Sequence, residues 1–155
     1  GKFILNNNKL ANSPYTLCET VPQTIDCIAD ALLKDVVAVD LETTGLDYKK
    51  DKITTIGVST GEGQAFIIPV THRESPFTED ELSEINTHIK LLMASNVNKV
   101  FHNCKFDLKF LRNWGIETFS NIDDTQMMHS LVDENMPHGL MDLVKQYFPK
   151  ELDQF

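Results

Sequence analysis

Two carboxylates follow directly on an apolar run in the first third of the chain. Residues 36–39 are Val, Val, Ala and Val, which is typical of a buried β-strand, and Asp40 and Glu42 come at its end. Side chains two positions apart share one face of a strand, so the two acids project together. Two anions that lose water there repel each other, and a divalent cation between them would relieve the repulsion. The alternative is two ordinary acids that cap the turn at residues 43–45, because this spacing alone is common.

A third acid lies on an apolar helical stripe. Asp107 shares one helix face with Asn103, Phe106 and Phe110 by the i, i+3, i+4, i+7 rule, and Asn103 is expected to cap the helix. The positions three and four residues from Asp107 hold no Lys or Arg, so no helical ion pair is available. Such a departure from pattern is expected at functional sites. The alternative is that Asp107 lies at the edge of the stripe, in water.

The segments after the first two acids predict a β-meander. Residues 52–59 and 64–69 are rich in β-branched and aromatic side chains and flank Gly61-Glu62-Gly63, which is typical of an antiparallel hairpin. The strand that begins at residue 36 therefore joins a three-stranded meander.

A helix and one more strand follow the meander. Thr78 and Glu81 have the spacing of a capping box, and apolar residues recur at helical spacing as far as Met93. Residues 99–102 are predicted to form a strand, which after a crossover helix is most simply parallel to the first. The sequence thus predicts an α/β fold, with a mixed β-sheet of an antiparallel meander plus a parallel strand, flanked by helices.

The flanking segments complete one domain. Residues 1–14 are polar and without periodicity and are expected to be a flexible lead-in. An edge strand is predicted at 15–18 and a helix from about 20 to 34. Asp124 is expected to be the N-cap of a further helix, and a final amphipathic helix is predicted at 140–148.

The net charge of −9 constrains the partners. A protein that binds nucleic acid normally carries a basic face, because neutralising phosphates dominates its affinity. This chain alone is therefore expected to bind polyanions weakly. Two bound divalent ions would offset part of the local negative charge, and a basic partner domain could supply the rest.

Cysteine usage and hydropathy indicate the compartment. Cys18, Cys27 and Cys104 are odd in number and form no CxxC pair, which favours reduced thiols over a disulfide framework or a zinc site. No stretch approaches the roughly 18 apolar residues of a membrane span, and the first apolar run is too short for a signal peptide. We expect a protein of the cytoplasm or another intracellular nucleic-acid compartment, neither secreted nor in a membrane.

Two stretches together resemble the first and second motifs of the DEDD superfamily of 3′–5′ exonucleases. The first runs from Val39 to Leu46 (VDLETTGL) and precedes the predicted pair of strands, and the second runs from Phe101 to Asp107 (FHNCKFD). Both motifs in the right order are far more specific than either one. Within the superfamily the chain is most similar to the proofreading domain of A-family DNA polymerases, with ribonuclease D a close cousin, over about residues 15–148. The resemblance implies a ribonuclease H-like fold with its site at the carboxyl end of the central strand.

The resemblance implies a two-metal mechanism. In a complete enzyme, two Mg²⁺ or Mn²⁺ ions about 3.5–4 Å apart clamp the attacking water and the leaving 3′ oxygen of the terminal phosphodiester. Asp40 would bridge both ions, Glu42 would serve one and help to position the nucleophile, and Asp107 would reach the other. Oxygen ligands with open water positions suit these hard cations better than zinc.

The resemblance also implies a binding site for the substrate. Thr43 and Leu46 would contact the terminal nucleotide, with Leu46 against its base, and Asn103 and Phe106 would hold sugar and phosphate. The implied substrate is the 3′ end of single-stranded DNA, with RNA as the alternative, because an unpaired base costs little to splay out. The implied partner is the polymerase domain of the same parent chain.

One part of the family pattern is missing. The family needs a fourth carboxylate with a Tyr or His four residues before it, on a helix beyond the last one predicted here. His129 with Asp133, and Tyr147 with Glu151, have this spacing, but both pairs come too early in the order of elements. We therefore expect residues 15–155 to be an exonuclease-like domain truncated before its third motif, weak or inactive as it stands.

Three functions stay open from the sequence. The first is the proofreading 3′–5′ exonuclease of an A-family DNA polymerase. The second is a ribonuclease D-like RNA exonuclease, which differs in its contacts with the 2′-hydroxyl. The third is a non-catalytic remnant that keeps the fold as a scaffold, favoured by the missing motif and opposed by the intact Asp40, Glu42 and Asp107.

Overall fold

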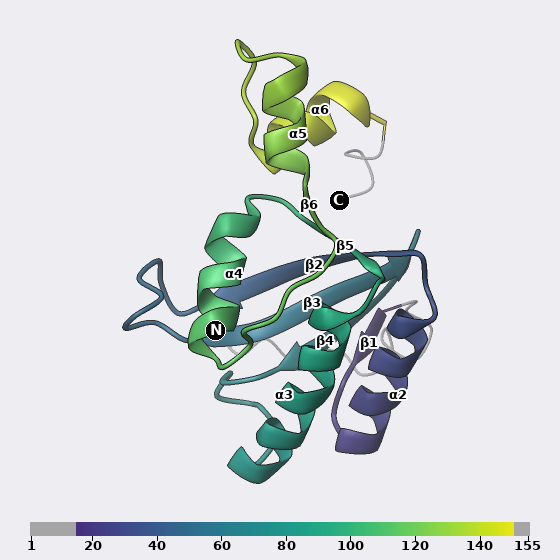
Figure 1. Ribbon diagram of the computed structural model, residues 1–155, viewed down its shortest axis with the longest axis vertical. Helices are drawn as coiled ribbons and strands as arrows, with labels where there is room; N and C mark the ends of the chain where they lie inside the picture. The colour runs from purple at the N-terminus through teal and green to yellow at the C-terminus, as the bar shows by residue number, and fades with distance from the viewer. Residues whose placement is uncertain (1–14, 151–155) are drawn as a thin grey trace.

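The structure, a computed structural model, describes residues 15–150, and a six-stranded mixed sheet runs through them (Figure 1). The expected lead-in at 1–14 lies outside the described residues. The strands are β1 (Tyr15–Leu17), β2 (Val36–Thr43), β3 (Ile53–Gly61), β4 (Gln64–Pro69), β5 (Asn98–Phe101) and β6 (Ile122–Asp124). The helices are α2 (Val21–Leu32), α3 (Glu79–Ala94), α4 (Cys104–Asn113), α5 (Thr125–Val132) and α6 (Leu140–Tyr147).

The sheet has the order β1-β4-β3-β2-β5-β6, with β2 near its centre. β2 pairs antiparallel with β3, β3 antiparallel with β4, and β2 parallel with β5, so the predicted meander and parallel strand are both confirmed. β1 lies parallel to β4 at one edge. β6 pairs parallel with β5 at the other edge and was not predicted from the sequence. Its three residues are too few to show a period of two.

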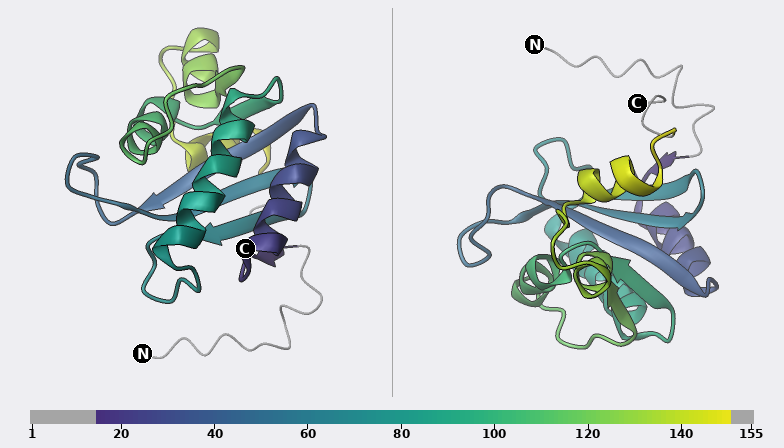
Figure 2. Two further views of the ribbon diagram at one scale, coloured as in Figure 1. Left: turned by 60° about the horizontal axis from the view of Figure 1, so that its bottom comes forward. Right: turned by 90° about the horizontal axis from the view of Figure 1, so that it is seen from above.

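The hydrophobic core lies on one face of this sheet. Along β2 the residues Val37, Val39 and Leu41 are buried, and the residues between them are exposed. Two views show α2, α3 and α4 covering the same face (Figures 1 and 2). α3 buries Ile85 and Ile89 there, at the helical spacing that predicted it, and its capping box of Thr78 and Glu81 is present as expected.

The opposite face of the sheet is largely open. Val36 is 51% exposed, and Ile67 of β4 is 40% exposed. α6 lies on this side (Figure 2, right), and its Leu140 lines a cavity of about 400 Å³ together with residues of β2, β3, β4 and β5. The two faces therefore have different roles, since one closes the core and the other leaves β2 accessible.

α2 ends earlier than predicted, at Leu32 rather than at about Lys34. The backbone N–H groups of Leu33 and Lys34 donate to the carbonyls of Asp30 and Ala31, each at 3.1 Å. This tighter i→i−3 pattern commonly closes the last turn of a helix, and it carries the chain directly into β2.

No helix in the described part of the chain is both long enough and apolar enough to cross a lipid bilayer.

A lysine lies inside the core. Lys99 of β5 is 0% exposed on the face that also carries Phe101, and its Nζ donates to the carbonyl of Ser95 at 2.7 Å, just beyond the end of α3. Burial lowers the pKa of this ammonium group, because the charged form is poorly solvated there. The single hydrogen bond at a helix C-terminus offsets part of that cost.

We predict that Lys99→Met leaves the free energy of unfolding unchanged or raises it, because methionine fills the same space without a charge to desolvate. Lys99→Ala should lower it by about 2–4 kcal/mol through the cavity that it leaves. Urea denaturation at neutral pH measures both. A Met variant as unstable as the Ala variant would show that the bond to Ser95 matters more than packing.

Candidate functional site

Asp40 and Glu42 lie at the carboxyl end of β2, on the open face of the sheet. The alternation of burial along β2 confirms that they share a face. Asp40 is paired across the sheet with Gly57 of β3, which places no side chain beside it. Both acids are exposed, so they keep their hydration, and the expectation that they lose water was wrong. The register of β2 and β3 shifts between Glu42 and Thr43, an irregularity that often re-aims side chains near active sites.

Asp107 of α4 is the buried acid of the site, with 4% of its surface exposed. This confirms that it lies within the apolar stripe rather than at its edge. Burial, and then the nearby charge of Asp40, raise the pKa of Asp107 to about 7, although the backbone N–H groups of Asp107 and Leu41 act in the opposite direction. α4 therefore brings the Asp107 carboxyl to the end of β2, beside Asp40.

The three predicted metal ligands do not form a closed cluster. Within residues 15–150, no group of three or more His, Cys, Asp or Glu side chains is arranged to hold a metal ion. Asp107 and Asp40 interact, and Glu42 shares the strand face of Asp40. The described residues thus supply only part of the set of carboxylate oxygens that would bind a metal ion.

The start of α4 is held by Asp124, not by the side chain of Asn103. Asn103 occupies the N-cap position with a left-handed backbone (φ 68°), but its side chain makes no capping bond, so that prediction was wrong. Instead the carboxylate of Asp124 accepts from the backbone N–H groups of Asn103 (3.0 Å) and Cys104 (2.8 Å). The predicted cap on α5 is also present, because Asp124 accepts from Gln126 and Met127.

Three of the four predicted substrate-binding residues line one cavity. Leu46, Asn103 and Phe106 enclose a space of about 220 Å³, and the remaining lining residues are Tyr48, Lys105, Lys109 and Phe110. Leu46 is 85% exposed, so an apolar side chain stands free at the rim. Thr43 is not part of this lining, and its hydroxyl donates to the carbonyl of Gly45 at 2.7 Å.

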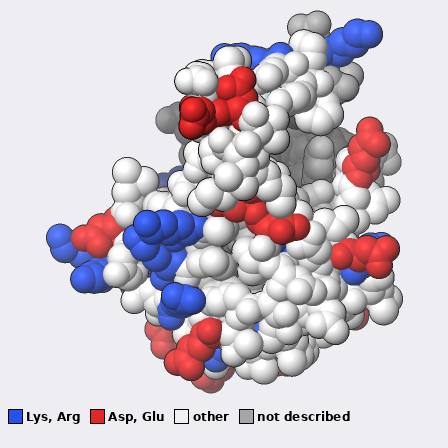
Figure 3. Space-filling model, turned by 45° about the horizontal axis from the view of Figure 1, so that its top comes forward, with Lys and Arg blue, Asp and Glu red and all other residues white. Residues whose placement is uncertain are grey.

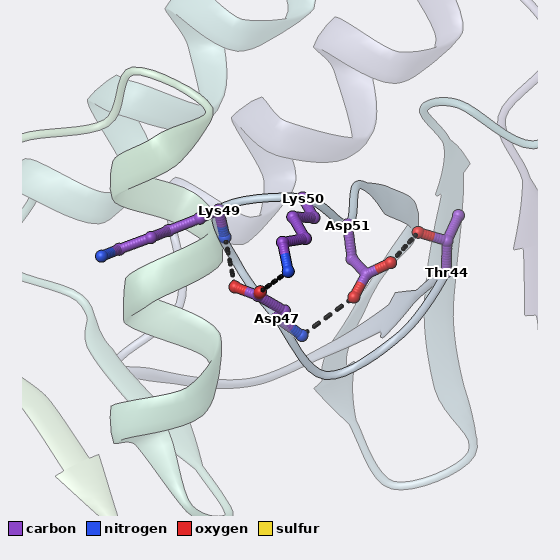
Figure 4. A network of polar contacts seen from close by, with 5 residues as sticks. All are labelled: Thr44, Asp47, Lys49, Lys50 and Asp51. Carbon is purple, nitrogen blue, oxygen red and sulfur yellow. Dashed lines mark hydrogen bonds and ion pairs between the residues drawn. The ribbon is translucent and has the colours of Figure 1, made fainter.

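The loop that carries Leu46 is organised by Asp51 (Figure 4). Its carboxylate accepts from the hydroxyl of Thr44 (3.1 Å) and from the backbone N–H of Asp47 (2.9 Å), and Asp47 forms an ion pair with Lys50 at 3.4 Å. A Cβ atom added to Gly45 would lie 2.5 Å from this carboxylate, so no other residue fits there without displacing it. These contacts hold Leu46 at the cavity.

His102 belongs to the second motif, and its residue type and position alone predict no role for it. Its Nδ1 lies 2.9 Å from the hydroxyl of Thr125, which itself donates to the carbonyl of Phe101 at 3.2 Å. If the hydroxyl proton of Thr125 lies on the bond to Phe101, Nδ1 of His102 carries the ring proton. Nε2 is buried without a hydrogen-bond partner among the described residues, and His102 lines the 400 Å³ cavity together with Asp40.

We predict that Asp107→Asn stabilises the metal-free chain at pH 8 and changes little at pH 5. Because the folded pKa is raised from 3.8 to about 7, the folded chain binds this proton more tightly, and the free energy of unfolding of the wild type falls as pH rises from about 4 to about 7. The gain from Asn is roughly 2–4 kcal/mol at most. Urea denaturation across this pH range, with the exposed Glu84→Gln as control, measures it. A difference between Asp107→Asn and wild type that stays constant with pH would contradict the assignment.

We predict that Asp124→Ala destabilises the chain by about 2–3 kcal/mol at neutral pH, because it removes the caps of two helices at once. Burial alone would raise the pKa of Asp124, but the backbone N–H groups of Asn103 and Cys104 outweigh it and lower the pKa. This stability is therefore present above the unfolded pKa of about 4 and is lost as pH falls through the folded pKa. Thermal melts at neutral and acidic pH measure the loss, with Glu134→Ala as control. Equal melting temperatures for Asp124→Ala and the control would rule out the double cap.

Comparisons with known proteins point to one family. A family profile described as 3′-5′ exonuclease matches residues 16–154. DNA polymerase I of Borreliella burgdorferi is 27% identical over 143 residues, which cover 92% of this chain and 16% of that protein. The DNA polymerase of Escherichia phage T5 is 30% identical over 133 residues, or 77% of this chain and 14% of that protein. The chain thus spans only 16% and 14% of the length of these two relatives.

A solved structure shows the same fold. Escherichia coli RNase D, described as an exoribonuclease involved in structured RNA processing, superposes with a TM-score of 0.69 at 18% identity, over 87% of this chain and 33% of that one. The expected ribonuclease H-like fold is thereby confirmed. Together with the profile match over most of the sequence, these findings show that the chain belongs to the 3′–5′ exonuclease domains of the DEDD superfamily.

Proposed function

We propose that this domain removes nucleotides from the 3′ end of single-stranded DNA, as the proofreading exonuclease of an A-family DNA polymerase. The observation that carries the proposal is the position of Asp107. A buried carboxyl is held beside Asp40 at the end of β2, and the same helix turn presents Asn103 and Phe106 to the cavity under Leu46. A terminal nucleotide in that cavity would have its phosphodiester close to the two acids.

The donor atoms suit Mg²⁺ or Mn²⁺. Asp40, Glu42 and Asp107 offer carboxylate oxygens, which hard divalent cations prefer, and the exposure of Asp40 and Glu42 leaves room for water. Such ions, when bound, lower the pKa of a water nucleophile and stabilise charge on the phosphate. In the proposed site, Asp40 binds the ions from the strand β2 and Asp107 from the helix α4, and Glu42 orients the attacking water.

The incomplete ligand set is part of the proposal. Since the acids of residues 15–150 form no closed cluster, we propose that a further carboxylate from another segment of the parent protein completes the site. The open face beside Asp40, with its apolar cavity, offers space for such a segment. The polymerase part of the same protein is the proposed partner, and the proposed location is an intracellular compartment for DNA replication.

Two other functions remain to be separated by experiment. A ribonuclease D-like enzyme would act on RNA, which differs from DNA by the 2′-hydroxyl of each sugar. A scaffold without catalysis is favoured by the absence of a three-acid cluster in the described part of the chain.

The test is digestion of 5′-labelled single-stranded DNA and RNA of the same sequence, with Mg²⁺, Mn²⁺ or a chelator, by the parent protein and by the 155-residue chain. We expect the parent protein to shorten DNA from its 3′ end in a metal-dependent manner, and Asp40→Ala and Asp107→Asn to reduce the rate by about 10²-fold or more. The chain alone should be weak. Glu84→Gln, on α3, is the control that should keep full activity.

Each alternative has its own outcome. Faster digestion of RNA than of DNA would favour the ribonuclease D-like function. A parent protein without metal-dependent activity on either substrate would favour the scaffold. Digestion that survives Asp40→Ala would overturn the assignment of the site.

A further inference from the structure

One face of α4 carries a row of cations that have no carboxylate partner among the described residues, although Arg112 lies 5.6 Å from the ring centre of Phe119. Lys105, Lys109 and Arg112 follow at i, i+4 and i+7, so they lie along one stripe, and all three are exposed. The only ion pairs among residues 15–150 are Lys34 with Asp30 and Lys50 with Asp47. We call Lys105, Lys109 and Arg112 the basic ridge.

Arg112 lies in the last turn of α4, where the helix dipole favours a cation, but Lys105 and Lys109 do not stabilise the helix. Like charges three and four residues apart destabilise a helix by about 0.2–0.5 kcal/mol for each pair. Lys105 also lies in the first turn of α4, where the helix dipole favours anions over cations. In a chain with a net charge of −9, three neighbouring cations without carboxylate partners point to an anionic ligand.

The basic ridge begins at the cavity of Leu46 and leads away from it. Lys105 and Lys109 are lining residues of that cavity. The Nζ of Lys109 lies 5.5 Å from the ring centre of Tyr48. The Nζ of Lys49, the residue that follows Tyr48, lies 5.9 Å from the same ring centre. The loop after β2 thus adds a cation and an aromatic ring to the ridge. Figure 3 shows Lys and Arg side chains gathered on this side of the molecule, next to an acidic group.

We propose that the basic ridge binds the phosphodiester backbone of a single strand upstream of the nucleotide held in the cavity. The domain therefore prefers oligonucleotides of several residues over dinucleotides. This inference rests on the proposed function, because the cavity is taken to hold the 3′-terminal nucleotide. Cations beside a stacking-competent ring are the usual means of binding single strands without reading their sequence.

The arrangement also separates two electrostatic tasks. The acids at the end of β2 repel a phosphate until cations are bound there, whereas the basic ridge attracts phosphates at any metal concentration. Oligonucleotide binding should therefore persist in a chelator, and its salt dependence should report the contacts of the ridge.

The test is fluorescence anisotropy of labelled oligothymidylates, of about ten nucleotides and of two nucleotides, with the 155-residue chain in a chelator. The ridge variant is Lys105→Gln with Lys109→Gln. The control is Lys90→Gln with Lys145→Gln, which changes the net charge equally at exposed positions of α3 and α6. Lys105→Arg with Lys109→Arg tests whether charge alone suffices. Circular dichroism melts show that each variant is folded.

We expect the ridge variant to weaken binding of the longer oligonucleotide roughly tenfold at low salt, and to reduce the slope of log Kd against log salt by about 1.4, or 0.7 for each lost phosphate contact. The control should change Kd less than about twofold, and the Arg variant should bind like the wild type. The dinucleotide reaches only the cavity end of the ridge, so the ridge variant should weaken its binding less than that of the longer oligonucleotide.

Three results would overturn the inference: a ridge variant that matches the control, an equal loss for the dinucleotide, or a wild type that does not bind the longer oligonucleotide. The proposed function fails separately. If Leu46→Ala leaves binding of both lengths unchanged and the parent protein digests nothing, while the ridge variant still loses affinity, the ridge is a nucleic-acid surface of a domain that is not an exonuclease.

Discussion

The two-residue period of β2 is the constraint on which the rest of the structure depends. One set of its side chains, including Val37 and Leu41, closes the core under α2 and α3, and the other set presents Asp40 and Glu42 on the open face. A shift of the register by one residue would bury both acids and expose the core. The antiparallel pairing with β3 and the parallel pairing with β5 fix this register from both sides, so the chemistry and the stability of the domain rest on the same hydrogen bonds.

Local periodicity was enough to predict the central elements. The alternation in β2 predicted the shared face of the two acids, and the stripe of α4 predicted a buried Asp107, because each depends only on neighbours within a turn or a strand. The second cap made by Asp124 could not be predicted, since its partner Cys104 is twenty residues away along the chain. The contact of His102 with Thr125 and the hydration of Asp40 could not be predicted either, because both depend on how segments distant in sequence pack together.

The charges of the domain are distributed by function rather than evenly. The acidic excess of the whole chain would argue against a nucleic-acid partner, yet α4 carries its buried acid on one face and its cations on another. Burying Asp107 costs stability when it is ionised, and the stripe of Lys105 and Lys109 costs helix stability. Both costs are of the kind expected where a structure is shaped for a ligand rather than for its own folding.

The close approach of Gly45 to Asp51 links two positions that are six residues apart in the sequence. Any larger residue at 45 would force the Asp51 carboxylate out of its place, while a small residue at 51 would free the space and release the loop from Thr44 and Asp47. The effects of substitutions at the two positions are therefore not additive. Once residue 51 has lost its carboxylate, a side chain at position 45 has none of these hydrogen bonds left to break, so the second mutation costs the loop less than the first.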